Sequence, residues 1–411
     1  MSEVVEGLTV ELDEWDDSDP LPISSEDEEF VSTVVNETGN KLRVEYLPDG
    51  EAKIHSNRFV GVVSLPSGLR IEITPKAAAG NLLYLLRYSA NVPAATFDQP
   101  THLTRGANFL DIIAQLFIDE LQRVLQRGIS RSYENTHGNE PYLKGKLLIR
   151  EQFTRHLQGK IDFACEFDDF TADTLLNQAI LSATVVLSEL ATERGLKRDL
   201  QGYRTVLRRH VTERPVRGDE LDAIELTRLN DYYEQLLRLT ELVLDGTFIE
   251  TLEAGYRDTY SILLNMDRVF ESAIARSFTE VVEGRPGWEV YTQTRNRSLI
   301  TGGTKVTLRP DILLRFEDAV ELVADTKWKL HRTNSDLYQM VSYQLAYDAP
   351  GALIYPTQQG EILDSLTVDD QYPLDLVEID TRGQVGDFDE FCQHMKDVTL
   401  EMMIALVGEL K

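Results

Sequence analysis

The chain has 411 residues, of which 42% are hydrophobic, and this is enough for two or three domains with buried cores. Its 69 acidic residues against 41 basic ones give a formal net charge of −28, a balance that indicates a halophilic protein from a high-salt cytoplasm. The sequence has neither an apolar run of about 18 residues nor a basic segment followed by an apolar stretch, so we expect a cytoplasmic protein without a membrane span or signal peptide.

The acidic balance would ordinarily argue against nucleic-acid binding, because phosphates are bound by Lys and Arg. In a halophilic protein the acidic surface is a background property, so only local basic patches are informative. The two cysteines, Cys165 and Cys392, lie far apart and lack metal-ligand spacing, so we expect them to be reduced interior residues.

Residues 1–30 are rich in Asp and Glu and contain no Lys or Arg. Self-repulsion and low burial predict a largely disordered, solvated tail. Residues 31–100 then show short β-like runs at 41–46, 59–64 and 69–74, separated by turn sequences that contain Pro and Gly. We expect a small β-rich N-terminal module there, in the form of a meander or a barrel.

Helical periodicity dominates residues 101–255, which we expect to form a mostly helical, Arg-bearing middle domain. Residues 256–411 alternate between helix and strand, so the fold class that we expect is α/β there and α+β over the whole chain. No G-x-x-x-x-G-K-[ST] phosphate loop is present, so nucleotide-driven work would have to come from a partner. The helices that periodicity predicts in the first half of the chain cover residues 81–90, 107–126, 175–192 and 220–244.

Two apolar, strand-like runs on either side of residues 317–319 predict a β-hairpin, in which we expect Phe316 to pair with Val320. That register places Asp311 directly opposite Asp325, with Cβ atoms about 4.5–5.5 Å apart. Two like charges opposite each other destabilise a sheet unless a cation bridges them. The pair therefore predicts a Mg²⁺ site, which Mn²⁺ could also fill.

Lys327 follows Asp325 by two residues, so strand alternation places both side chains on one face. The ammonium can there approach a metal-bound water or a phosphate oxygen. A hard cation that polarises a phosphoryl group, with a positive group beside it, is the equipment that phosphodiester hydrolysis needs. The alternative is structural: Asp311 opens the strand in a Pro-Asp turn, and Asp325 and Lys327 form a solvated ion pair at a strand end.

Arg309-Pro310-Asp311, followed by Asp325-Thr326-Lys327-Trp328-Lys329, resembles the PD-(D/E)xK signature of the McrC family. The resemblance covers most of the chain after the tail. It implies that residues 256–411 form a restriction-endonuclease-like domain and that the chain is the nuclease subunit of a modification-dependent restriction system. The flanking similarity lies in residues 69–76, 142–146, 165–170, 173–177, 265–271 and 336–347.

The resemblance also implies a partner. This is an AAA+ GTPase ring of the McrB type, which recognises modified cytosine in DNA and whose GTP hydrolysis the nuclease subunit stimulates. The β-rich module and the helices before residue 250 would then form the docking part.

In the mechanism that the resemblance implies, Asp311, Asp325 and the carbonyl of Thr326 bind Mg²⁺, while Lys327 orients or deprotonates the attacking water. Glu271 lies at the edge of an apolar helix stripe. Enzymes of this kind often place a helix glutamate beside the metal, so Glu271 is the candidate third acid and third carboxylate ligand. The alternative for Glu271 is an ordinary acid on a helix surface.

Gln339 and Tyr343 are four residues apart on the helix after the lysine strand, and so share one face. That face could contact the scissile DNA strand or the attacking water, with Gln339 as a catalytic and Tyr343 as a DNA-binding candidate. The alternative is polar packing at the edge of the core.

Lys329 and Arg332 are candidates for contacts with DNA phosphates, although charges that leave a strand are usually just solvated. Arg295 and Arg297 are weaker candidates of the same kind. His331 has no neighbouring His or Cys that would favour a metal role.

Together these features predict a Mg²⁺-dependent DNA endonuclease subunit that docks on an AAA+ GTPase ring. One alternative is a stand-alone repair nuclease, since RecB-type nucleases have a similar Gln–Tyr spacing. The other is an adaptor that binds DNA and regulates the motor without cutting. The long N-terminal portion favours a docked subunit over the first, and the intact acid and lysine set speaks against the second.

Overall fold

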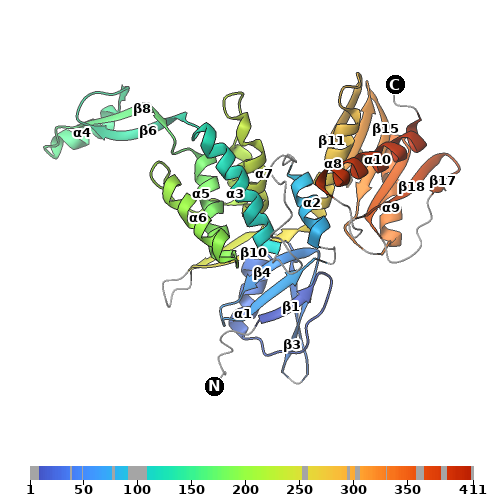
Figure 1. Ribbon diagram of the computed structural model, residues 1–411. Helices are drawn as coiled ribbons and strands as arrows, with labels where there is room; N and C mark the ends of the chain where they lie inside the picture. Colours follow the sequence, from blue (N-terminus) through green and yellow to red (C-terminus); the bar gives the residue numbers. More distant parts are fainter. Residues whose placement is uncertain are drawn as a thin grey trace. The chain divides into compact units, whose positions relative to one another are not determined.

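The structure is a computed structural model (Figure 1). Contacts divide the chain into two compact units, one of Met1–Ile113 with Phe248–Lys411 and one of Ala114–Thr247. Within the described residues, no helix is both long and apolar enough to cross a membrane. The residues that the structure describes are 9–37, 39–48, 50–75, 79–90, 109–251, 258–293, 297–300, 306–329, 331–357, 365–380 and 387–408.

The first unit contains a five-stranded sheet in the order β1-β5-β4-β10-β9. β1 runs parallel to β5, and β4 is antiparallel to both β5 and β10. The sheet therefore combines strands from the beginning of the chain with strands from its middle. Its strands are β1 (Thr9–Asp13), β4 (Phe59–Ser64), β5 (Arg70–Thr74), β9 (Thr247–Thr251) and β10 (Asp258–Asn265).

A hairpin and short helices pack with this sheet around a core that includes Phe30, Ile54 and Ile71. The predicted runs at 41–46, 59–64 and 69–74 are confirmed as strands, whereas β3 was not predicted. The additional elements are α1 (Ser25–Phe30), the π-helix Val31–Val35, β2 (Leu42–Tyr46), β3 (Ala52–Ser56) and α2 (Ala79–Ser89).

The prediction of a disordered, solvated tail is wrong for residues 9–30; residues 1–8 lie outside the described part of the chain. Residues 9–13 alternate apolar and polar side chains, and Leu12 is buried in the core while Glu11 is exposed. α1 begins with a capping box between Ser24 and Asp27. Alternation of apolar residues outweighed the local acidic charge, because a strand buries only one of its faces.

The second unit is mainly helical. α5 is buried along most of its length, and Asn177 near its start donates to the carbonyls of Ser130 and Ala172 at 2.9 and 2.8 Å. A three-stranded sheet in the order β6-β8-β7 was not predicted from the helical periodicity. The elements are α3 (Phe109–Arg127), β6 (Ser132–Glu140), β7 (Lys146–Leu147), α4 (Ile149–Leu157), β8 (Phe163–Thr171), α5 (Leu175–Leu190), α6 (Arg194–Leu207) and α7 (Glu234–Asp245).

The predicted helix over residues 220–244 is broken into two short 3₁₀ turns, Gly218–Ala223 and Asp231–Tyr233, and then α7. Between the turns, the Asn230 side chain accepts hydrogen bonds from the Thr227 backbone N–H and hydroxyl at 2.6 and 3.0 Å. Asn and Thr compete in this way with helical backbone bonding, which explains the interruption.

The C-terminal part of the first unit is built on a six-stranded mixed sheet in the order β11-β14-β15-β16-β18-β17. The predicted alternation of helix, strand, hairpin, helix and strand is confirmed, and the mixed α/β fold agrees with the PD-(D/E)xK expectation. Its elements are α8 (Met266–Val282), β11 (Trp288–Thr292), β14 (Ile312–Phe316), β15 (Ala319–Thr326), α9 (Asn334–Tyr347), β16 (Gly351–Pro356), β17 (Ser365–Val368), β18 (Tyr372–Ile379) and α10 (Phe388–Val407), with the separate pair β12 (Arg297–Ile300) and β13 (Val306–Leu308).

Helices cover both faces of this sheet. α9 packs its Met340, Tyr343 and Tyr347 against Val323 and Leu353 on one face. α8 and α10 contact β15 as well and lie together on the other side of the sheet, joined by a 2.8 Å hydrogen bond between Ser277 and Thr399 (Figure 1). β15 and β16 run parallel to each other, so their carboxyl ends lie at one edge of the sheet.

Gly61 is the position in β4 that allows β10 to pair closely. Its φ is 141°, and a Cβ there would lie 2.0 Å from the carbonyl oxygen of Ile262. We expect Gly61→Ala to lower the free energy of unfolding by at least about 3 kcal/mol, measured by urea denaturation. Gly50→Ala is the matched control, because Gly50 also has a positive φ of 91° but no atom within 4 Å of a built Cβ. That control should cost only about 1–2 kcal/mol; equal losses in the two variants would contradict the steric explanation.

Candidate functional site

The β14–β15 hairpin sets the register of the two predicted acids. At its tip Phe316 pairs with Ala319, one residue earlier than predicted, around a turn with Glu317 at φ 53°. A bulge between the tip and Leu314 restores the register, and Ile312 pairs with Ala324. The predicted register is thus reached at Ile312 and Ala324 by two shifts that cancel, and its next step would set Asp311 opposite Asp325.

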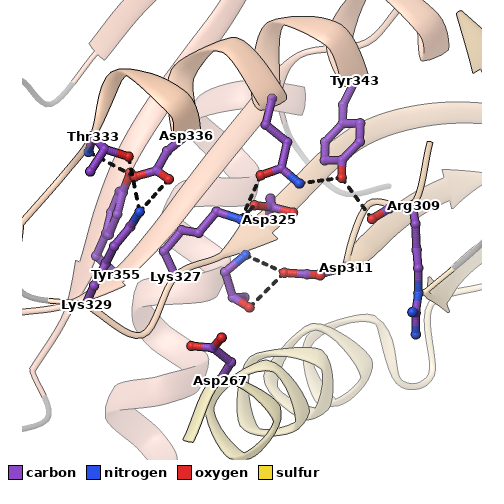
Figure 2. A network of polar contacts seen from close by, with 12 residues as sticks. Asp267, Arg309, Asp311, Asp325, Lys327, Lys329, Thr333, Asp336, Tyr343 and Tyr355 are labelled. Atoms are coloured by element: carbon purple, nitrogen blue, oxygen red, sulfur yellow. Dashed lines mark hydrogen bonds and ion pairs between the residues drawn. The ribbon is translucent and has the colours of Figure 1, made fainter. Parts of the chain in front are cut away.

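Asp311 is held at the entrance of β14 from both sides. Its Oδ2 accepts hydrogen bonds from the backbone N–H and the hydroxyl of Thr326, at 2.7 and 2.9 Å. Its carbonyl oxygen accepts from the backbone N–H of Gln293 at 2.9 Å. Figure 2 shows the Asp311 carboxylate between the end of β15 and α8.

Asp325 is a buried acid, with 1% of its surface exposed. Burial and the neighbouring Asp311 carboxylate raise the pKa of Asp325 above its ordinary value. Its Oδ2 forms an ion pair with Lys327 Nζ but accepts no hydrogen bond of good geometry. Burial by itself would lower the pKa of Lys327, but Asp325 and Asp311 outweigh it, so this pKa lies above its ordinary value.

α9 extends the network away from Lys327. Lys327 Nζ donates to Gln339 Oε1 at 3.0 Å, and Gln339 Nε2 donates to the Tyr343 hydroxyl at 2.8 Å. Tyr343 donates in turn to the carbonyl oxygen of Arg309 at 2.9 Å, which closes a chain of contacts back to the residue two before Asp311 (Figure 2). The predicted shared face of Gln339 and Tyr343 is therefore confirmed, and it points at the lysine.

Glu271 lies near Asp311 but has its own partner. Burial, and then the Asp311 carboxylate, raise the pKa of Glu271 to about 7. Glu271 Oε1 accepts a hydrogen bond from Gln293 Nε2 at 2.7 Å, and Arg309 also contacts the Gln293 side chain.

Asp267 was not predicted as part of the site. It lies one turn before Glu271 on α8 and pairs with Arg58, the residue before β4, at 2.8 Å. Burial raises the pKa of Asp267. Arg58 and Lys327 act in the opposite direction, and the Asp311 carboxylate adds to the increase. The spacing of four residues between Asp267 and Glu271 is the signal that could have identified it, because side chains at i and i+4 share a helix face.

The donor set fits a hard divalent cation. Two carboxylates from opposed strands meet at the carboxyl edge of β15, and one oxygen of the buried Asp325 accepts no hydrogen bond of good geometry. Oxygen donors of this kind suit Mg²⁺, which keeps several of its waters and needs only one or two protein carboxylates. Among the described residues no three His, Cys, Asp or Glu side chains are gathered as a metal site, so Glu271 is not brought into the group.

The predicted DNA-binding residues differ in exposure and in the partners that they contact. Lys329 Nζ pairs with Asp336 at 2.5 Å and donates to Thr333 at 3.2 Å, so it holds the start of α9. Tyr343 is 4% exposed, a buried position that does not suit a direct DNA contact. Arg332 is exposed and remains a candidate.

Of the two weaker candidates for phosphate contacts, Arg295 and Arg297, the structure describes one. Arg297 donates to the carbonyl oxygen of Ala346 at 2.5 Å and stacks over Tyr347. Arg295 lies outside the described residues, and His331 is exposed.

Glu271 should make stability depend on pH. A carboxyl whose pKa is raised to about 7 in the folded state favours its protonated form there, so the folded state loses stability as pH rises from about 4.5 to about 7. We expect Glu271→Gln to match the wild type at pH 4 and to exceed it by about 1–2 kcal/mol at pH 8, allowing for partial exposure. Urea denaturation in EDTA measures this, and a difference that is constant with pH would contradict it.

The family model for the McrBC 5-methylcytosine restriction system component matches residues 54–356. No curated protein gives a significant match. A chain in the tetradecameric assembly of Thermococcus gammatolerans McrB AAA+ hexamers with bound McrC is 18% identical, with a TM-score of 0.54, over 95% of this chain and 100% of that chain. A chain in the cryo-EM structure of the Thermococcus gammatolerans McrBC complex is 17% identical over 67% of this chain and 88% of that chain, with a TM-score of 0.42. Because the family match spans residues 54–356 of 411, this chain belongs to the McrBC 5-methylcytosine restriction system component family, as its resemblance to McrC implied.

Proposed function

We propose that this chain is the Mg²⁺-dependent DNA endonuclease subunit of its restriction system and that it docks on an AAA+ GTPase ring of the McrB type. The observation that supports the nuclease proposal is the buried Asp325 carboxylate paired with Lys327, next to Thr326, whose N–H and hydroxyl donate to Asp311. Family membership supports the restriction role but does not by itself supply the chemistry.

Asp311 and Asp325 would hold the cation together with the carbonyl of Thr326. When bound, Mg²⁺ supplies Lewis-acid polarisation of a phosphoryl oxygen and a more acidic water. The hydrogen bonds from Thr326 keep one Asp311 oxygen fixed, so the carboxylate does not have to reorganise when substrate arrives.

Lys327 acts in this proposal as a cation and a hydrogen-bond donor. The carboxylates of Asp325 and Asp311 keep its pKa above the ordinary value, so the amine stays protonated near neutral pH. It would therefore orient the attacking water or a phosphate oxygen by donating a hydrogen bond. Gln339 fixes the direction of the ammonium by accepting one of its hydrogens at 3.0 Å.

The docking proposal is supported by apolar side chains that the second unit leaves in solvent. They lie in residues 132–171, where β6, β8 and α4 extend away from α3, α5 and α6 (Figure 1). α4 buries none of its residues. Contiguous exposed apolar side chains are typical of an interaction surface. They are Tyr133, Tyr142, Leu143, Ile149, Phe153, Leu157, Ile161 and Phe170.

The related assembly supports the choice of partner. The Thermococcus gammatolerans structure contains McrB AAA+ hexamers with bound McrC. The present sequence lacks a phosphate loop of its own, so a separate ring would supply the nucleotide-driven work. The base that the system reads is proposed to be a modified cytosine, as the family description indicates.

Removing either acid or the lysine should slow DNA cleavage strongly. With the ring protein, GTP and Mg²⁺, we expect Asp311→Asn, Asp325→Asn and Lys327→Ala each to slow cleavage of methylated DNA by about 10²–10³-fold. The assay is gel-based and spans a range of KCl concentrations, because a net charge of −28 predicts a salt requirement. Glu321→Gln, on the same strand as Asp325, is the matched control and should stay within about twofold of the wild type.

Each rival hypothesis has its own outcome in this assay. Equal Mg²⁺-dependent cutting with and without the ring would support a stand-alone nuclease. No cutting by the wild type, together with stimulated GTP hydrolysis, would support an adaptor. Cutting that survives in Asp325→Asn would refute the assigned site.

The exposed apolar side chains should contribute to ring binding. Phe153 and Leu157 on α4 are 66% and 72% exposed, so Phe153→Ala and Leu157→Ala should leave the unfolding free energy nearly unchanged. We expect each to weaken binding to the ring by about 5- to 10-fold, measured by surface plasmon resonance. Leu229→Ala is the control, because Leu229 is 89% exposed in the same unit but lies outside residues 132–171. Equal effects of all three substitutions would argue against docking through this segment.

A further inference from the structure

Glu14 is a buried carboxylate that comes from the opposite end of the chain to the candidate nuclease site. It is 3% exposed and directly follows β1. Both of its carboxylate oxygens accept from the indole Nε1–H of Trp328, at 3.1 and 2.9 Å. Trp328 is the residue immediately after Lys327 and is 4% exposed. A buried charge with this geometry costs free energy unless its hydrogen bonds are made, so the contact is specific.

The backbone at Glu14 is held by hydrogen bonds. Its backbone N–H donates to the carbonyl of Thr74 in β5 at 2.9 Å, and the N–H of the next residue, Trp15, donates to the carbonyl of Asn57 at 3.2 Å. Trp15 has a φ of 60°, which is unusual for a bulky side chain and persists only where the surroundings hold the backbone. The backbone that carries the Glu14 carboxylate is therefore fixed at the end of β1.

Trp328 lies two residues beyond the end of β15. β15 ends at Thr326, and the backbone N–H of Lys327 donates to the carbonyl of Ile354 in β16 at 2.9 Å. Beyond that point the Trp328 indole packs on Phe270, with 5.5 Å between ring centroids. Phe270 precedes Glu271 on α8, so the indole links the segment after β15 to the helix that carries Glu271.

We propose that Glu14 is a positioning residue for the nuclease site: through Trp328 it fixes the end of β15, and with it the direction in which Lys327 meets Asp325. A second contact also joins the N-terminal part to the site elements, since Arg58, the residue before β4, pairs with Asp267 of α8 at 2.8 Å. The N-terminal sheet thereby forms part of the framework of the site, although it contributes no group to the reaction. This inference rests on the nuclease function proposed above.

The test compares Glu14→Ala, Glu14→Gln and Trp328→Phe in the complete protein with its ring partner. Glu14→Ala removes the acceptor, Glu14→Gln keeps one carbonyl oxygen for the indole N–H, and Trp328→Phe removes the donor but keeps an aromatic ring. We expect Glu14→Ala and Trp328→Phe to lower kcat by about 10- to 100-fold with KM for DNA within about twofold, as expected for a misplacement of about 1 Å. Glu14→Gln should recover kcat to within about threefold of the wild type. Glu11→Ala, at an exposed position of β1, is the control and should retain wild-type kcat.

A spectroscopic readout separates the contact from the reaction. The chain has 3 tryptophans, so a proton–nitrogen NMR spectrum shows three indole cross-peaks, of which Trp328→Phe removes and thereby assigns one. Glu14→Ala should shift that peak and speed its exchange with deuterium, whereas Glu11→Ala should not. A double variant, Glu14→Ala with Trp328→Phe, should lose no more activity than the worse single variant, because both act through one contact.

Three results would overturn the inference. If Glu14→Ala shifts the indole peak but has the kcat of Glu11→Ala, the contact exists and does not position the site. If the peak does not move, Glu14 does not hold Trp328. Should Glu14→Ala fail to fold, Trp328→Phe decides alone, and an unchanged kcat there refutes the role. Absence of any Asp325-dependent cleavage in the wild type is a different failure, since it refutes the proposed function while the NMR result still reports on the contact.

Discussion

The burial of the Asp325 carboxylate beside Asp311 is the constraint around which the C-terminal domain is arranged. A buried acid with a like charge opposite is unfavourable unless cationic or hydrogen-bonding partners compensate it. Lys327 supplies a positive charge, and Thr326 supplies two hydrogen bonds to Asp311. These partners lie at the carboxyl edge of β15, where the sheet ladder ends and side chains from α8 and α9 can approach. The site is therefore incomplete on the hairpin alone and depends on the helices of both faces.

Elements distant in sequence converge on that edge. β10 pairs with β4 of the N-terminal sheet and leads directly into α8, whose N-cap is Asn265. The backbone N–H of Met266 donates to the carbonyl of Arg58 at 3.2 Å, and the Arg58 side chain pairs with Asp267. The first turn of α8 is thus set by the N-terminal sheet before it reaches Glu271. A domain boundary drawn at residue 256 would separate β10 from the strands with which it pairs.

Local patterns predicted the elements well where one signal dominated. The apolar run of β4, the alternation in β5 and the periodicity of α5 were enough to place them. The prediction failed where two signals competed. The acidic residues around β1 indicated disorder although the strand alternates, and the side chain of Asn230 interrupted an otherwise helical pattern. The hairpin register is a different case. The tip was predicted one residue out of register, and the bulge between Leu314 and Arg315 offsets that error. The ladder therefore has the predicted register where it ends, at Ile312 and Ala324.

The sequence by itself determined the family, through its motifs, and the α/β character of the C-terminal domain, through its periodicity. It also determined the shared face of Asp325 and Lys327, because residues two apart on a strand point to the same side. Tertiary structure alone decided that Tyr343 is buried, that Lys329 pairs with Asp336 in the first turn of α9, and that Glu271 is bonded to Gln293 and not gathered with the other acids. It also decided that Glu14 meets Trp328 across 314 positions of sequence. Such contacts depend on how whole sheets and helices pack, and no local pattern encodes which distant residue will fill the space beside a given side chain.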